Sequence, residues 1–317
     1  MDLPDLAQQP ANLAFDDFHD GISRMGVVFV NLYAVTNGDG SWTMIDTGLP
    51  FFGGGIKAAC DARFDGRPPD AIVLTHAHFD HAGNAAWLAE HWGCPIYVHE
   101  REMPFVTGES DYPPGDPTPG GAICFLSRFF PTGGHDWRGR VDLRELPEDG
   151  SIPSMPGWRW LHTPGHTPGH VSLFRDADKT LLAGDALATM DLDSWTQQAI
   201  RERKACRPAT PFTPDWPSAH DSVRRLADLE PNVAAAGHGL PMTGRHVAAD
   251  VAELAASLRP PEHGRYVPAP AAYGPDGAVV AVPPPEPDPL PRNLALAAVA
   301  TVGLGVLGYV LASRDRA

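Results

Sequence analysis

The chain has 317 residues, 43% hydrophobic and 20% charged, so it can bury a large core in one catalytic domain with appendages. Its formal net charge of -15 argues against nucleic acid and other polyanionic partners, which need basic surface. The four cysteines include no CxxC pair, which argues against a zinc ribbon or a disulfide framework and is typical of reduced cytosolic thiols. We therefore expect a small-molecule substrate.

The first hundred residues alternate between strand and helix patterns. Residues 1–20 are acidic, with no basic segment before an apolar run, so we expect an N-terminal extension and no signal peptide. Residues 27–35 form a strand pattern closed by the turn sequence NGDG, and residues 42–45 return as the hairpin partner. This alternation predicts layered sheets. It continues with a helix at 53–62, a strand at 71–74, a helix at 84–92 and a strand at 95–98.

Three histidines and an aspartate gather where the strand at 71–74 ends. In an extended segment His76 and His78 point the same way, because side chains alternate with period two. Asp80 and His81 then fall past the bend and face a neighbouring point. This spacing favours two adjacent metal ions over a single ion.

Residues 100–150 lose this periodicity, and residues 113–121 form a loop rich in proline and glycine. Long irregular insertions beside a site usually carry specificity. Residues 125–130, which include Phe129, offer apolar surface that would line a pocket or pack the insertion onto the core. We interpret His135 as a surface residue and His99, at the end of the strand before the insertion, as a hydrogen-bonded rim residue.

The second half of the chain adds polar residues at the ends of short apolar strands. Proline and glycine on either side of His166 fix a rigid turn that presents one imidazole. His170 and His162 are interpreted as structural or outer-shell histidines. Asp185 follows the strand at 181–183, and His238 follows the strand at 233–236. Strand ends that carry such residues are expected to converge on one rim.

Together these residues resemble the five motifs of the metallo-β-lactamase-fold hydrolase superfamily, in the right order and over residues 21–258. The resemblance implies an α/β fold, a four-layer αββα sandwich with the site at one edge of two packed sheets. It also implies a first metal held by His76, His78 and His166, and a second held by Asp80, His81 and His238. Asp185 would bridge the two metals, and Asp46, after the strand at 42–45, would be a supporting outer-shell carboxylate with His170.

The resemblance implies two zinc ions that share one water, whose pKa zinc lowers to about 7, so that a bridging hydroxide attacks the scissile carbonyl. Asp80 and Asp185 are the candidate catalytic carboxylates, and Asp80 or a bound water would deliver a proton to the leaving group. Iron or manganese would satisfy the same nitrogen and oxygen ligands.

The substrate class narrows by comparison with other members of the superfamily. The bridging Asp185 argues against β-lactam hydrolysis, the acidic charge against a nuclease, and the proline-rich sequence after Leu258 against a glutathione-gripping domain. A small ester, thioester or lactone remains. An acyl-homoserine-lactone lactonase is an alternative, although no tyrosine lies between Tyr112 and Tyr266 to contact its substrate. A membrane-tethered binding module with a non-catalytic metal site is the alternative from another class.

Residues 186–216 are expected to cover the pocket, followed by outer-layer helices at 218–229 and 245–258. Candidate pocket-lining side chains are Phe129, Met190, Trp195, Phe212 and Trp216, with packing of a lid as the alternative.

The end of the chain differs from the rest. We expect a catalytic domain at 21–262 and a proline-rich linker at 263–292, with a hairpin near Pro275-Asp276-Gly277. Residues 294–312 carry no charge, and at about 1.5 Å per residue such a helix spans a bilayer core. The sequence therefore predicts a transmembrane helix at 293–312 with a short tail at 313–317. The catalytic domain would be anchored on the cytoplasmic side.

Overall fold

The computed structural model describes residues 13–200, 202–288, 290 and 294. The chain divides into two compact units, Met1–Pro284 and Pro285–Ala317, and the first unit carries both large sheets. Among the described residues, no helix is both long and apolar enough to cross a membrane. Apart from Leu294, the predicted span at 293–312 lies outside the described residues and stays a prediction.

The first sheet has seven strands in sequence order. The first four pair antiparallel and the last three join in parallel, each reached through a crossover segment. The predicted hairpin around the sequence NGDG is confirmed, because Thr36 pairs with Trp42 across it. The strands are β1 (Asp16–His19), β2 (Ile22–Val27), β3 (Val30–Thr36), β4 (Trp42–Ile45), β5 (Ala71–Val73), β6 (Ile96–Val98) and β7 (Leu143–Glu145).

The second sheet has five strands in the order β12-β11-β10-β9-β8. Only β10 and β11 pair in parallel, and their connection, residues 185–232, crosses one face of the sheet through one outer helix. The strands are β8 (Trp158–His162), β9 (Val171–Arg175), β10 (Thr180–Gly184), β11 (Val233–Ala236) and β12 (Met242–Thr243).

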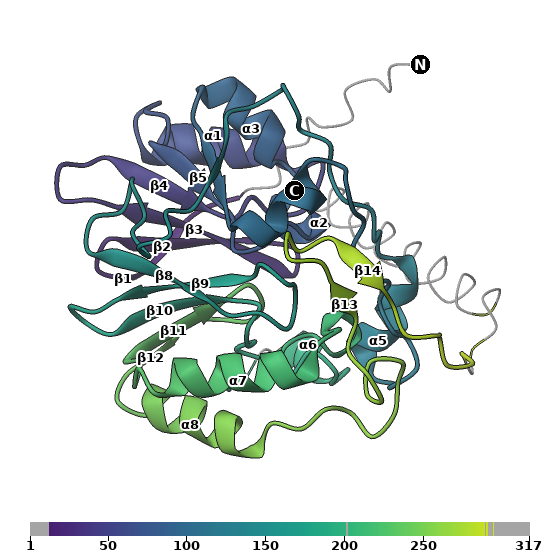
Figure 1. The fold of residues 1–317 in the computed structure, drawn as a ribbon. Coiled ribbons are helices and arrows are strands. Elements are labelled where there is room, and N and C mark those ends of the chain that lie inside the picture. Colours follow the sequence, from purple (N-terminus) through teal and green to yellow (C-terminus); the bar gives the residue numbers. More distant parts are fainter. Residues whose placement is uncertain (1–12, 201, 289, 291–293, 295–317) are drawn as a thin grey trace, which may run out of the picture. The chain divides into compact units, whose positions relative to one another are not determined.

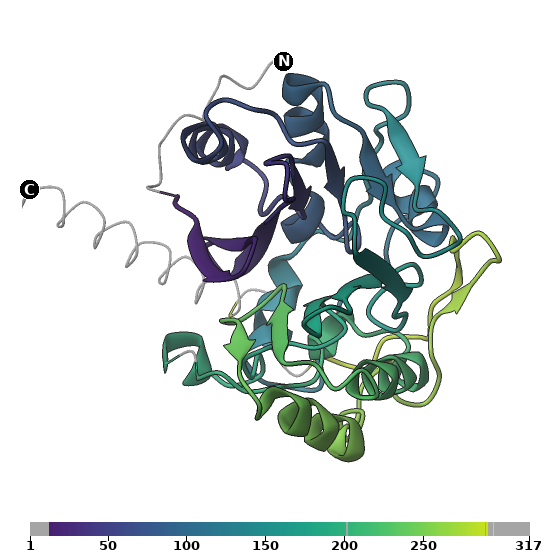
Figure 2. The same ribbon diagram turned by 90° about the vertical axis from the view of Figure 1, so that its left-hand side faces the viewer.

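Helices cover the outer face of each sheet (Figure 1). On the first sheet lie α1 (Gly53–Arg63) and α3 (Ala85–Trp92), and on the second lie α7 (Trp216–Ala227) and α8 (Val247–Ser257). Figure 2 shows the same arrangement from the side, with the blue helices above one sheet and the green helices below the other. The shorter helices are α2 (Phe79–Ala82), α4 (Met103–Val106), α5 (Ala122–Leu126) and α6 (Gln197–Ile200).

The period-two alternation of strand side chains builds three apolar layers. In β3, Leu32 and Ala34 pack with the helices of the first sheet, whereas Tyr33 and Val35 face the second sheet. In β10, Leu182 faces the first sheet, while its neighbours on either side pack under α7 and α8. The order of layers is therefore helices, sheet, sheet, helices, as expected from the sequence.

Two strand expectations need correction. The pattern at 27–35 is not one strand, because the chain turns at Val28, whose φ of 60° is rare for a β-branched residue, and β2 pairs back on β3. The insertion at 100–150 is not wholly irregular. It includes α4 and α5, and β7 joins the edge of the first sheet in parallel to β6.

The predicted hairpin near Pro275-Asp276-Gly277 is confirmed by β13 (Ala272–Tyr273) and β14 (Val279–Ala281), which pair antiparallel. It belongs to the first unit, although residues 263–292 were expected to be linker. Arg101 Nη2 donates to the carbonyl of Gly274 at 3.2 Å, and Ser110 Oγ accepts the N–H of Val279 at 3.1 Å. Bonds to the insertion therefore hold this hairpin against the domain.

Candidate metal centre

The polar residues singled out in the sequence meet at one rim of the two sheets. His76 and His78 follow β5, and Asp80 and His81 lie in α2. His166 lies in the β8–β9 loop, Asp185 follows β10, and His238 follows β11. Their side-chain nitrogen and oxygen atoms form three overlapping groups in which all ligand atoms lie within 4.8 Å of one another. The groups are His76, His78 and His166; His76, His81 and Asp185; and Asp80, His81 and His238.

The first group consists of three imidazoles. His78 Nδ1 lies 3.0 Å from His76 Nε2 and 2.9 Å from His166 Nε2. Burial lowers the pKa of His76 and His78 well below the usual range, and that of His166 to about 4, so all three rings are neutral at pH 7. One proton on His78 Nδ1 cannot serve both neighbours. A metal ion that all three lone pairs share fits this arrangement.

A second ligand group consists of Asp80, His81 and His238, and Asp185 lies beside both this group and the first. His238 Nε2 lies 3.5 Å from Asp80 Oδ2 and 3.2 Å from Asp185 Oδ2, and His81 Nε2 lies 3.5 Å from Asp185 Oδ1. Asp185 Oδ2 also lies 3.5 Å from His166 Nε2, so this carboxylate borders both groups. Metal–ligand bonds of about 2.1 Å in tetrahedral geometry place ligand atoms roughly 3.4 Å apart, as here.

Two buried atoms of this group, His81 Nε2 and Asp185 Oδ1, have no hydrogen-bond partner. Such atoms are rare in folded proteins unless an ion or water satisfies them. Burial opposes a charge on His81, yet the carboxylates of Asp185, Asp46 and Asp80 raise its pKa well above the usual range. Burial also opposes the charge of Asp185, but His238 and His81 hold its pKa well below the usual range. The donor set therefore fits divalent cations.

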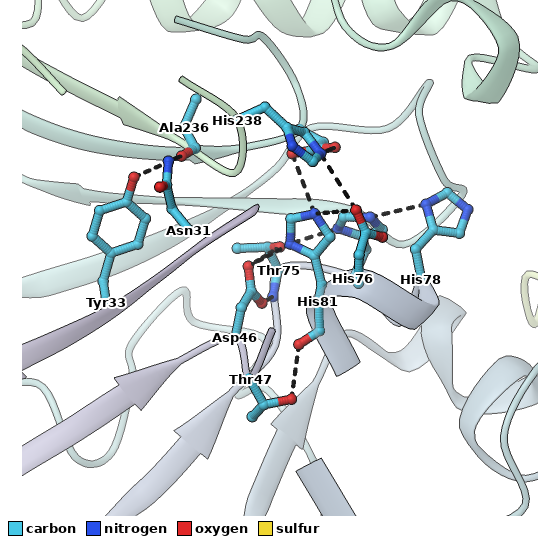
Figure 3. Close-up of polar contacts among 12 residues, drawn as sticks. Asn31, Tyr33, Asp46, Thr47, Thr75, His76, His78, His81, Ala236 and His238 are labelled. Carbon is cyan, nitrogen blue, oxygen red and sulfur yellow. Dashed lines mark hydrogen bonds and ion pairs between the residues drawn. The ribbon is translucent and has the colours of Figure 1, made fainter. Parts of the chain in front are cut away.

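Asp46 orients His81 from behind. Its Oδ1 accepts the backbone N–H of Thr75 at 2.8 Å, and its Oδ2 accepts the Thr75 hydroxyl at 2.8 Å. The same Oδ2 lies 2.8 Å from His81 Nδ1, so the ring donates there and turns Nε2 toward the other ligands (Figure 3). Asp46 reaches this position with a left-handed φ of 59°, the kind of backbone strain that concentrates at functional sites.

The first sheet also fixes the loop that carries His238. His238 Nδ1 donates to the carbonyl of Phe29 at 2.9 Å, which leaves Nε2 facing the other ligands. Tyr33 and Asn31 both donate to the carbonyl of Ala236, at 2.6 and 2.9 Å (Figure 3). Neither anchor was expected from the sequence, although polar side chains in the middle of the apolar strand β3 were a usable signal.

Close packing dictates a glycine in this loop. A Cβ at Gly237 would lie 2.1 Å from Asp185 Oδ1 and 2.4 Å from His81 Cε1. No side chain fits there without displacing a ligand.

The remaining histidines support the ligands. His170 Nε2 accepts the backbone N–H of Asp185 at 2.8 Å, and its Nδ1 meets the Thr163 hydroxyl at 2.8 Å. His162 donates to the carbonyl of Pro168 at 2.8 Å, while His99 accepts the N–H of Arg101 and stacks on His162. The surface interpretation of His135 was wrong. Its ring packs on Trp137 and donates to the carbonyl of Ala77 at 3.1 Å.

A hollow of about 460 Å³ opens over the ligands His78, Asp80, His166, Asp185 and His238. Apart from the ligands, Tyr112 and Thr132, its lining is apolar, and no lysine or arginine stands among the described residues that line it. The apolar lining residues are Phe29, Phe79, Pro113, Ile123, Phe130, Pro131, Ala209 and Phe212.

The five predicted pocket-lining residues lie in different places. Phe212 lines the hollow, whereas Phe130 lines it in place of its neighbour Phe129. Met190 lines an adjoining hollow of about 650 Å³, which shares Phe29, Ile123, Phe130 and His238 with the first. Trp195 is 59% exposed and packs on Phe125. Trp216 is buried in the core beneath the second sheet.

Comparison with known proteins agrees with this geometry. The model of the metallo-beta-lactamase superfamily matches residues 25–238. The chain is 42% identical over 242 residues to the probable metallo-hydrolase YflN of Bacillus subtilis, covering 75% of this chain and 91% of that protein. It is 29% identical to an N-acyl homoserine lactonase of a Bacillus species, over half of each chain.

Among solved structures, a beta-lactamase domain protein of Burkholderia ambifaria has the same fold, with a TM-score of 0.51 and 23% identity over 80% of this chain and 79% of that one. The converging histidines and aspartates, the two sheets and the match over most of the chain lead to one conclusion: the chain belongs to the metallo-beta-lactamase superfamily.

Proposed function

We propose that the protein is a dinuclear metal-dependent hydrolase that acts on the carbonyl group of a small, uncharged ester, thioester or lactone. The observation that carries the proposal is the position of Asp185. Its Oδ2 lies 3.5 Å from His166 Nε2 of the first group and 3.2 Å from His238 Nε2 of the second, and its Oδ1 lies 3.5 Å from His81 Nε2 of the second. The carboxylate therefore borders both groups, as a bridging ligand would. The relative YflN, described as a probable metallo-hydrolase, supports hydrolysis as the reaction type.

The chain would hold one ion with His76, His78 and His166, and the other with Asp80, His81 and His238. Two zinc ions, or iron or manganese on the same donors, would supply Lewis acidity and a water acidic enough to be a nucleophile at neutral pH. Asp46 and His170 keep His81 and Asp185 in their orientations. Asp80 lines the hollow, where its carboxylate would accept a proton from the bound water and pass it to the leaving group.

The walls of the hollow support an uncharged substrate. A β-lactam or a glutathione thioester carries carboxylates, which need a cationic partner when they leave water. Outside the metal positions, the described lining of this hollow offers aromatic and aliphatic side chains and no lysine or arginine, and Arg24 lines only the adjoining hollow. An ester or lactone with an apolar group would place its carbonyl at the ligands and its apolar group against the walls. It would bury no unpaired carboxylate.

An N-acyl homoserine lactone is the second candidate, because it is an uncharged lactone and one relative is described as a lactonase for that class. The tyrosine nearest the ligands, Tyr112, packs its ring on His78 with centroids 4.3 Å apart. Its hydroxyl donates to Glu102 and accepts the N–H of Ala77, so it points away from the substrate space. Recognition of a lactone would then depend on the apolar walls of the hollow and not on this tyrosine.

The test measures metal content and turnover together on the purified chain. Zinc-loaded protein is assayed on uncharged aryl esters, thioesters and lactones, with a carboxylate-bearing β-lactam as the matched anionic substrate. We expect turnover of the uncharged panel, loss on chelation, recovery on readdition of zinc, and no β-lactam hydrolysis. Two bound metals without turnover of any uncharged substrate would favour the non-catalytic binding module instead.

We also propose that residues 293–312 anchor the protein in a membrane, from the charge-free sequence there. The full chain should then sediment with membranes and resist carbonate extraction, whereas a chain ending at Pro283 should stay in the supernatant. Recovery of the full chain without detergent would contradict the anchor.

A further inference from the structure

Glu102 is a buried carboxylate that the ligand set does not include. It ends a short 3₁₀ helix, Glu100–Glu102, directly after β6, and it is 1% exposed. Its Oε2 accepts the backbone N–H of Ala77 at 3.0 Å and the hydroxyl of Tyr112. Its Oε1 accepts the hydroxyl of Thr167 at 2.6 Å and the backbone N–H of Gly169 at 2.9 Å. Four donors therefore converge on the two oxygens.

Three of these donors come from the two segments that carry the first ligand group, and the fourth, Tyr112, lies in the insertion. Ala77 lies between His76 and His78, after β5 of the first sheet. Thr167 directly follows His166, in the loop between β8 and β9 of the second sheet. One carboxylate thus ties together ligand segments that are about 90 residues apart in sequence and belong to different sheets.

The bonds explain why a charge-bearing group is tolerated at this depth. A buried carboxylate is costly unless several donors compensate it, and bonds to a charged acceptor are roughly twice as strong as neutral ones. With both oxygens occupied, Glu102 is not available to a substrate. Its effect must pass through the segments it joins.

We propose that Glu102 is the positioning residue that sets the distance between the His76–His78 pair and His166, and so the affinity of the first metal position. The inference rests on the proposed metal centre. Hydrogen-bonded groups behind metal ligands typically change metal affinity by about 10- to 100-fold when they are replaced.

The test uses Glu102→Gln in the full chain. The amide keeps the shape of the side chain but turns an NH₂ group toward two of the four donors, whichever way it is oriented. Metal-free wild type and variant are titrated with Zn²⁺ against a chromophoric chelator. We expect affinity for one of the two ions to fall by about 10- to 100-fold. With Co²⁺, the visible absorption that reports ligand geometry should also change.

Asp116→Asn is the matched control. Asp116 is 2% exposed and accepts the N–H and hydroxyl of Thr118 and the N–H of Arg265, so it is an equally buried, loop-holding carboxylate. These hydrogen bonds join Asp116 to residues outside the ligand segments. We expect this variant to lose thermal stability while zinc affinity and the Co²⁺ spectrum stay those of the wild type.

Tyr112→Phe and Thr167→Val each remove a single donor and should weaken zinc binding less than Glu102→Gln does. Combining either substitution with Glu102→Gln should lower zinc affinity little further, because both residues act through their hydrogen bonds to Glu102. Wild-type zinc affinity in Glu102→Gln, or a loss no larger than that of Asp116→Asn, would overturn the inference. If the wild type takes up no metal, the proposed metal centre itself is refuted, and the inference with it.

Discussion

The base and the walls of the hollow are held by different interactions. At the base of the hollow, the candidate ligand residues follow the ends of strands. Hydrogen bonds on the side away from the hollow fix their rings, as the bond from His81 to Asp46 does. The walls come from the β2–β3 hairpin tip, from the insertion and from the segment at 209–212. There, Phe29 and Phe130 stack with centroids 5.8 Å apart, and Phe130 stacks on Phe212 at 6.0 Å.

Hydrogen bonds are directional, so replacing one atom at the base should disturb ligand geometry for every substrate. Aromatic packing is broad and adjustable, so changes in the walls should alter which substrates fit and leave metal binding intact.

Asp185→Asn should have the largest effect. The amide keeps the shape but removes the negative charge between the two ligand groups, so we expect loss of one metal equivalent and a fall in turnover of at least about 10²-fold. Metal analysis and steady-state kinetics on one aryl ester measure both. Wild-type turnover with full metal content would show that Asp185 is not a bridge.

Asp46→Asn should come next, because it acts through one ligand only. The amide can no longer accept from both Thr75 and His81, and we expect metal affinity to fall by about 10- to 100-fold. Zinc competition titration measures the loss, and excess zinc should restore much of the activity. An unchanged affinity would mean that the ring of His81 is held by packing alone.

Phe130→Ala should change selectivity without changing metal content. Phe130 and Phe29 border both the hollow over the ligands and the adjoining hollow of about 650 Å³, so truncation should join the two. We expect the ratio of kcat/KM for an octanoyl over an acetyl aryl ester to rise by about 10-fold, within the range a pocket change supplies.

Phe125→Ala is the control for that series, because Phe125 lies in the same insertion and lines neither hollow. Phe29→Ala should shift the ratio in the same direction as Phe130→Ala. An unchanged ratio in both variants, with zinc content as in the wild type, would contradict a selective role for this wall.

The smallest effect is expected far from both regions. Asp178 accepts from Arg175 Nη2 at 2.7 Å and lies 2.6 Å from His19 Nε2. Burial opposes its charge, but these bonds lower its pKa below the ordinary 3.8. The carboxylate therefore stabilises the fold above pH 3.8, and this contribution is lost as the pH falls through the lowered value.

Because 32% of the Asp178 side chain is exposed and water screens the pair, Asp178→Asn should cost less than about 1 kcal/mol at pH 7. Urea unfolding at several pH values should show that the difference in free energy of unfolding between wild type and variant becomes smaller below pH 3.8. Zinc affinity should not change. A gap that widens on acidification would contradict the assigned sign.

Much of the arrangement at the base of the hollow can be predicted from the sequence, because the patterns that indicate its residues are local. His76, His78, Asp80 and His81 lie within six residues after a predicted strand, and the other ligands each follow a short apolar run or a proline–glycine turn. Strand ends of packed sheets share a rim, so local placement leads to a common site. The structure brings all seven candidate ligand residues together.

Only the tertiary structure decided the rest, because it depends on contacts between distant segments. Whether Phe129 or Phe130 faces the hollow is set by how the short helices of the insertion dock, and Trp216 turns into the core because α7 buries one face under the second sheet. Glu102 lies in a run of charged residues, Glu100-Arg101-Glu102, and no local pattern in the sequence distinguishes it. Its role appears only when β6 places it between segments from both sheets, since a carboxylate acquires four donors through the fold and not through its neighbours in the chain.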